Sequence, residues 1–69
     1  MEIEPTHYNY RVRWSADEGE FIATVAEFPL LSWLDVDQVD ALRGLVTVVA
    51  ETVDDLQVSG ERVPEPIHR

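Results

Sequence analysis

The chain has 69 residues, the size of one small domain, and its 14 carboxylates against five arginines give a net charge of −9. A surface this acidic repels nucleic-acid phosphates, and without cysteine the chain forms neither disulfides nor thiolate metal sites. The sequence also lacks a signal-peptide pattern and any apolar run of 18 residues, so we expect neither export nor a membrane span and predict a cytoplasmic location.

Chain length limits the stability of the fold. A domain of this size buries only about 60% of its unfolded surface and gains roughly 3–5 kcal/mol from its core. With no disulfide or metal motif, the remaining means of stabilisation is self-association, so we expect a dimer or higher homo-oligomer. No Gly-rich phosphate loop or nucleophile motif is present, and we expect no cofactor.

The first third of the chain predicts a β-hairpin. Residues 8–15 alternate apolar and polar side chains, the period of a strand with one buried face. Residues 16–20 supply a turn that contains Gly19, and residues 21–25 resume the alternation. Pro29 has no backbone donor and should interrupt the sheet before a short third strand around residues 30–34.

From Asp37 the apolar period becomes that of a helix of five or six turns. Asp37 is the expected N-cap and Gly60 the expected stop. The apolar side of this helix comprises Val39, Leu42, Leu45, Val46, Val49, Val53 and Leu56. Because we expect Val46 in the helix–sheet core, Val46→Asp should unfold the chain.

The two ends are expected to be disordered or extended, over residues 1–6 and 64–69. Pro64 and Pro66 fix their φ angles and lack donors, so the tail should form at most an edge strand.

The order of these elements, together with several short motifs, resembles the HicB-like antitoxin family over roughly residues 8–66. The matching motifs are Tyr10, Trp14-Ser15, Asp17 to Glu20, Glu27-Phe28-Pro29, Ser32, Asp40-Ala41-Leu42 and Val63-Pro64-Glu65-Pro66. The chain departs from the family pattern at Leu30 and Asp35, where the family usually has glycines. It also has Asp37 for the usual threonine N-cap and Val39 for the first glutamate.

The resemblance implies an α+β fold like a partial ribonuclease H domain. A three- to four-stranded, mainly antiparallel sheet would carry one long helix, in the order β-β-β-α-β, without that enzyme's catalytic set. Many members add a C-terminal DNA-binding segment. This chain ends at Arg69 without one, so we expect no direct contact with nucleic acid.

The acidic excess lies entirely within residues 16–58. It either keeps a small protein soluble or complements a basic partner. HicB-like antitoxins resemble inhibitors of small basic toxins that cleave mRNA, so the resemblance implies the antitoxin of a type II toxin–antitoxin pair. The alternative is a stand-alone, oligomeric HicB-like protein with a structural or scaffold role and no toxin.

Five residues are candidates for partner binding: Trp33, Leu34, Glu51, Asp54 and Asp55. A large apolar pair at residues 33–34 either fills the core or lies at an interface, where tryptophan is enriched. Asp54 and Asp55 oppose the helix dipole and are explained by solvation or by an acidic binding face. Gly44 in mid-helix indicates either a close contact or a tolerated flaw.

We assign no catalytic or metal-binding residues. The acidic residues at 17–20 and 35–40 could be cast as a two-metal nuclease site, but they fall at a predicted turn and a helix start. His7 and His68 lie near the chain ends without an acid or nucleophile nearby in sequence. An enzymatic interpretation, as a degraded ribonuclease H relative, would require metal-dependent cleavage of RNA.

Overall fold

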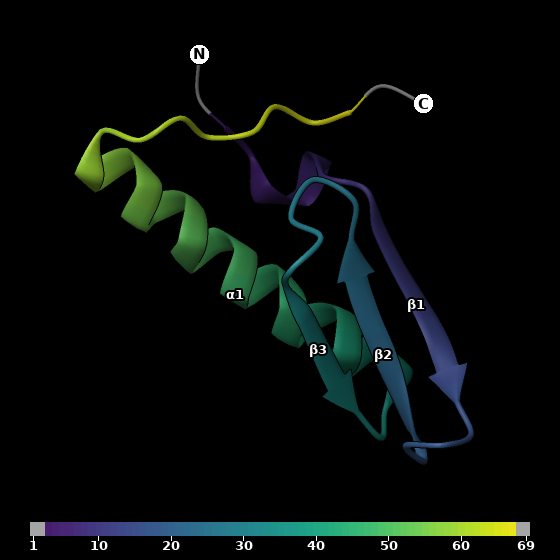
Figure 1. Cartoon of the computed structure of the whole chain (residues 1–69). Helices are drawn as coiled ribbons and strands as arrows, with labels where there is room; N and C mark the ends of the chain where they lie inside the picture. The colour runs from purple at the N-terminus through teal and green to yellow at the C-terminus, as the bar shows by residue number, and fades with distance from the viewer. Residues whose placement is uncertain (1–2, 68–69) are drawn as a thin grey trace.

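The computed structural model describes residues 3–67, in which a three-stranded antiparallel sheet carries one long helix across one face (Figure 1). The elements are the 3-10 helix η1 (Pro5–His7), the strands β1 (Tyr10–Ser15), β2 (Glu20–Val25) and β3 (Ser32–Asp35), and the helix α1 (Gln38–Ser59). The predicted α+β class, with one helix packed on an antiparallel sheet, is confirmed. Residues 3–67 contain no fourth strand.

The predicted hairpin is confirmed, with β1 antiparallel to β2 from Tyr10 opposite Val25 to Ser15 opposite Glu20. Gly19 takes φ 67°, a left-handed conformation that favours glycine, and its amide donates to the carbonyl of Ser15 at 2.9 Å. The strand begins at Tyr10 and not at Tyr8, because η1 precedes it. The prediction of a disordered or extended segment is therefore wrong for residues 5–6.

Pro29 interrupts the sheet as predicted, since residues 26–30 form turns between β2 and β3. β3 then pairs with β2 from Ser32 opposite Thr24 to Asp35 opposite Phe21. It begins two residues later than the predicted start at residue 30.

The predicted caps of α1 are both present. The Asp37 carboxylate accepts hydrogen bonds from the amides of Val39 at 2.9 Å and Asp40 at 3.0 Å. Gly60 ends the 22-residue helix with φ 77°, the left-handed conformation of a C-cap.

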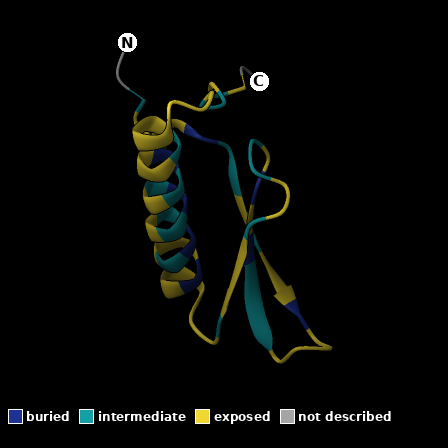
Figure 2. Cartoon of the chain, turned by 60° about the vertical axis from the view of Figure 1, so that its left-hand side comes forward, coloured by how far each residue is buried: buried dark blue, intermediate teal, exposed yellow. Residues whose placement is uncertain are grey.

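The core lies between α1 and the facing side of the sheet, as the buried residues in Figure 2 show. It consists of Tyr8, Ala23, Val25, Ala41, Leu45, Val49 and Val53. The helix thus contributes a buried stripe of one residue per turn, narrower than the predicted apolar side. Val46 is only half-buried at the margin of this stripe, so its predicted place in the core is wrong; Leu45 and Val49 are fully buried.

The tail beyond Gly60 is extended and forms no strand up to Ile67, the last described residue. The Tyr8 hydroxyl donates to the carbonyl of Pro64 at 2.6 Å, and the Asn9 side-chain amide donates to that of Ile67 at 2.8 Å. These bonds fix the tail at the end of the molecule where η1 lies (Figure 1). Within the described range, no helix has both the length and the apolar composition needed to cross a membrane.

Candidate protein-docking face

β3 lies at the edge of the sheet, so among residues 3–67 its outer backbone edge has no neighbouring strand. Trp33 stands opposite Ala23 on the helix side of the sheet, whereas Leu34 stands opposite Ile22 on the open side. The two side chains are 40% and 39% exposed. A chain that paired with this edge would contact Trp33 on one side and Leu34 on the other.

The Trp33 indole lies directly over Gly44 of α1. A Cβ atom added at Gly44 would clash with the indole, so only glycine leaves room for this contact. Of the two explanations for a mid-helix glycine, the structure favours the close contact. Trp33 is therefore held against the side of the helix that borders β3.

Toward the C-terminus of α1, this side of the helix carries acidic residues. Gly44, Val48, Glu51 and Asp55 follow one another at steps of three or four residues, so they share one side of α1, which we call the β3 flank. It extends over about 16 Å at 1.5 Å per residue. Glu51 and Asp55 are exposed, and the only ion pair among the described residues joins Arg43 to Asp40 at 3.9 Å.

Three of the five predicted site residues, Trp33, Glu51 and Asp55, thus lie along one side of the molecule. Asp54 is rotated by about 100° from Asp55 and lies at the solvent-facing border of the β3 flank, three residues from Glu51. Leu34 lies across the sheet from Trp33 and joins this group only through the β3 edge.

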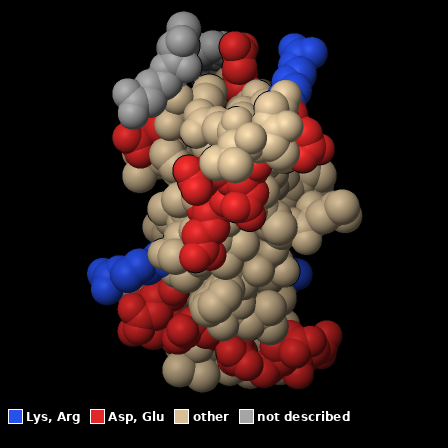
Figure 3. All heavy atoms as spheres, turned by 90° about the vertical axis from the view of Figure 1, so that its left-hand side faces the viewer, with Lys and Arg blue, Asp and Glu red and all other residues tan. Residues whose placement is uncertain are grey.

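The charged side chains of the β3 flank, Glu51 and Asp55, are both acidic. Figure 3 shows the side of the molecule on which α1 lies, where acidic side chains form several separate groups. The carboxyl end of a helix carries a partial negative charge, which adds to that of Glu51 and Asp55. The face is therefore suited to a cationic partner.

Other acidic residues serve the backbone. Asp37 caps α1, and the Asp35 carboxylate accepts from the amide of Asp37 at 2.9 Å. Among the described residues, no three His, Cys, Asp or Glu side chains form a group that could hold a metal ion. His7 is exposed in η1, and His68 lies outside the described residues.

The carboxylate of Glu27 has a structural role that the sequence did not indicate. It accepts from the Asn9 amide at 2.9 Å, the Asn9 side chain at 2.7 Å and the Ile67 amide at 2.8 Å. Burial raises the pKa of Glu27, but the hydrogen bonds from Ile67 and Asn9 outweigh it and leave the pKa below its ordinary value. Glu27 therefore joins the start of β1, the loop after β2 and the tail.

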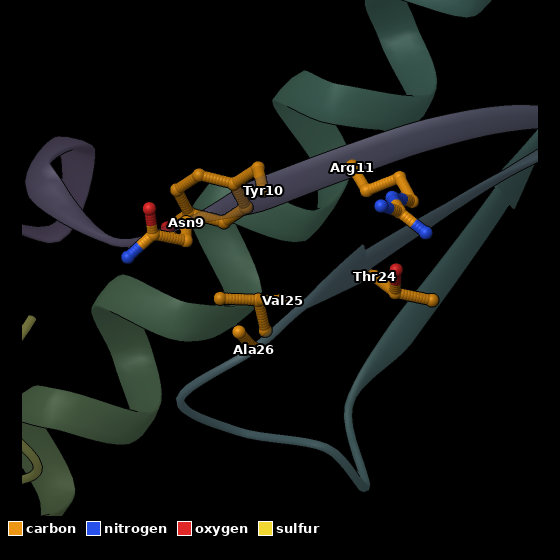
Figure 4. A pocket seen from close by; sticks show the side chains of 6 residues that line it. All are labelled: Asn9, Tyr10, Arg11, Thr24, Val25 and Ala26. Carbon is orange, nitrogen blue, oxygen red and sulfur yellow. The ribbon is translucent and has the colours of Figure 1, made fainter. Parts of the chain in front are cut away.

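A hollow of about 440 Å³ lies where β1 begins and β2 ends (Figure 4). Its lining residues are Asn9, Tyr10, Arg11, Thr24, Val25 and Ala26. Arg11 stands opposite Thr24 in the ladder and is the only charged lining residue. Without a carboxylate or histidine in its lining, this hollow offers no acid–base pair.

Comparison of the chain with protein-family models, with curated proteins and with solved structures finds no match.

Proposed function

We propose that this chain is a non-catalytic protein-binding module, a HicB-like antitoxin that neutralises a small basic mRNA-cleaving toxin in the cytoplasm. The observation that best supports this function is the combination of Trp33 with Glu51 and Asp55 beside the unpaired edge of β3. These features supply an aromatic anchor, negative charge and free backbone groups on one side of the molecule.

Each feature has a defined part in such binding. The β3 edge can accept a strand of the partner through backbone hydrogen bonds, as in β-augmentation. Trp33, already held by Gly44, loses little side-chain freedom on binding, and an anchor of this kind contributes about 2 kcal/mol or more. Glu51 and Asp55 raise the association rate of a basic partner by electrostatic steering, an effect that high salt weakens.

The test is affinity capture from cells of the source organism with four chains: wild type, Trp33→Ala, Glu51→Lys/Asp55→Lys and Asp17→Lys/Glu18→Lys. The last double variant is the matched control, because it makes the same charge change at the exposed hairpin turn. We expect the wild type and the control to retain a small basic protein that cleaves mRNA when released. The other two variants should lose it.

Equal capture by all four chains would remove the β3 flank from the interface. The stand-alone interpretation, an oligomeric HicB-like protein without a toxin, instead predicts that wild-type chain recovers only further copies of itself. Capture of a partner without ribonuclease activity would support the protein-binding module but overturn the antitoxin assignment.

A further inference from the structure

The opposite side of α1 differs from the β3 flank. Leu42, Val46 and Ala50 each follow a residue of the buried stripe, whereas Gly44 and Val48 each precede one. Because successive helical residues are rotated by about 100°, the first group lies on the side away from Trp33. We call this side, with Val39, the β1 flank.

The β1 flank is apolar and incompletely covered. Val39 is 60% exposed and Leu42 is 37% exposed, while Val46 and Ala50 are half-buried. β1 contacts α1 but leaves this side of the helix open, and on the helix side of β1 itself Trp14 is 54% exposed. The β1 flank therefore exposes apolar side chains, such as Val39 and Leu42, that the sequence pattern places on the apolar side of the helix.

Charge limits what can cover the β1 flank. On a chain of net charge −9, two copies repel each other across most of their surfaces. None of the four flank residues is charged, and the charged residues on its rim are Asp54 and Arg43, whose side chain lies 3.9 Å from Asp40 of the same helix. Arg43 follows Leu42, and Asp54 follows the buried Val53, so both lie on the outer border of the apolar surface.

The positions of these two charges are self-complementary. The midpoint between Arg43 and Asp54 falls between residues 48 and 49, and the midpoint between Val46 and Ala50 falls at residue 48. An antiparallel pair of α1 helices related by a two-fold axis near residue 48 would therefore bring Arg43 of each copy to Asp54 of the other. The small side chain of Ala50 near the axis allows the usual interaxial distance of 8–10 Å.

We propose that the β1 flank binds the same flank of a second copy, forming a two-fold symmetric dimer through antiparallel α1 helices with reciprocal Arg43–Asp54 pairs. A chain of this size gains little stability from its own core, and such a contact buries the uncovered apolar surface without opposing carboxylates. Because the contact involves one side of a single helix, we expect a weak dimer with a dissociation constant on the order of micromolar.

Pairing of β1 with its copy is a less favourable route to the same dimer. In an antiparallel pairing centred on Val12, Arg11 of one copy would stand opposite Arg13 of the other, and like charges directly opposite destabilise a ladder. The contact is therefore made by helix side chains and not by the sheet edge. It also leaves the β3 flank of both copies free, so the dimer does not depend on the proposed toxin.

The experiment is sedimentation of the full chain over about 1–500 μM, a range that brackets a micromolar dissociation constant. We expect a concentration-dependent shift from monomer to dimer in the wild type. Val39→Asp should weaken the dimer at least tenfold. Leu30→Asp is the control, since Leu30 is an exposed apolar residue in the turn between β2 and β3, outside α1, and should leave the dimer intact.

A charge exchange tests the register. Arg43→Asp and Asp54→Arg should each weaken the dimer, and the double exchange should restore it, while circular dichroism confirms that every variant is folded. The proposal is overturned if the wild type stays monomeric throughout, if Val39→Asp and Leu30→Asp act alike, or if the double exchange fails to restore the dimer. Loss of toxin capture with an intact dimer would reject only the proposed function.

Discussion

The two flanks of α1 face in opposite directions and carry opposite chemistry. Gly44, Glu51 and Asp55 give the β3 flank a space for an indole and a negative charge, whereas Leu42 and Val46 make the β1 flank apolar. Between them runs the only stripe that the sheet buries. One helix on a three-stranded sheet is thus covered along a narrow line, which leaves most of both flanks outside the helix–sheet core.

The largest expected effect comes from the stripe between the flanks. Leu45→Ala should cost about 2–5 kcal/mol, which is comparable to the whole stability expected of so small a core, and should leave much of the chain unfolded. Val46→Ala, one residue further round the helix, should cost less because Val46 is half-buried. Urea unfolding followed by circular dichroism measures both. Equal losses of unfolding free energy in the two variants would mean that Val46 is as deeply packed as Leu45, so that the buried stripe and the β1 flank are not distinct.

Gly44→Ala probes the β3 flank. Alanine gains up to about 1 kcal/mol of helix propensity over glycine, but displacing the Trp33 indole should cost about 1–3 kcal/mol. We therefore expect a net loss of stability and a red-shifted Trp33 emission, measured in a Trp14→Phe background. In a Trp33→Ala background the same substitution should stabilise the chain. A stabilising Gly44→Ala with Trp33 present would show that the indole does not rest there.

Glu27→Gln tests whether the tail is independent of the two flanks. Loss of the charged acceptor should cost about 1–3 kcal/mol and weaken protection of the Ile67 amide from hydrogen exchange. Because the folded-state pKa of Glu27 is lowered, its contribution is complete above its ordinary pKa and is lost as the pH falls through the lowered value. Wild type should therefore lose more stability on acidification than Glu27→Gln. Identical pH profiles would contradict this role.

The tyrosines near the β1 side should titrate late. Burial, with smaller contributions from the charges of Tyr8 and Glu27, raises the pKa of Tyr10 to about 12. The associated stability is present below the ordinary tyrosine pKa and is lost as the pH rises through this raised value. The difference between ultraviolet titrations of wild type and Tyr10→Phe gives the pKa of Tyr10. Ionisation of Tyr10 near pH 10 would contradict its burial.

The smallest effect distinguishes neighbouring carboxylates. Asp54→Asn and Asp55→Asn should each stabilise α1 by about 0.3–1 kcal/mol at low salt, because both remove a negative charge near the helix C-terminus. Their binding effects should differ: Asp54→Asn weakens the dimer, and Asp55→Asn weakens capture of a basic partner. Analytical sedimentation measures the effect on the dimer, and affinity capture measures the effect on partner binding. If both variants act alike in both assays, Asp54 and Asp55 do not belong to separate binding surfaces.

Much of the fold could be predicted because its signals are local. Period-2 alternation located the hairpin, Pro29 its interruption, and Asp37 and Gly60 the ends of the helix. The prediction was less accurate where distant contacts intervene. η1 shortened the first strand, and the width of the helix–sheet contact moved Val46 out of the core.

The candidate site was only partly predictable. The sequence singled out Trp33, Leu34 and the acidic end of the helix by their composition, but it treated Asp54 and Asp55 as one group. Helical rotation separates them. Glu27 belongs to one of the motifs that carry the family resemblance, but its structural role could not be predicted, because its three donors come from Asn9 and Ile67, which are distant along the chain.

The sequence by itself determined the period, caps and turns of each element, since these depend on residues within a few positions of one another. It also determined that the acidic excess lies in residues 16–58. Only the tertiary structure decided which side of α1 the sheet buries, that Trp33 rests on Gly44, and that an acidic and an apolar flank lie on either side of the core. Those outcomes depend on how β3 and β1 approach the helix in space, which local periodicity does not encode.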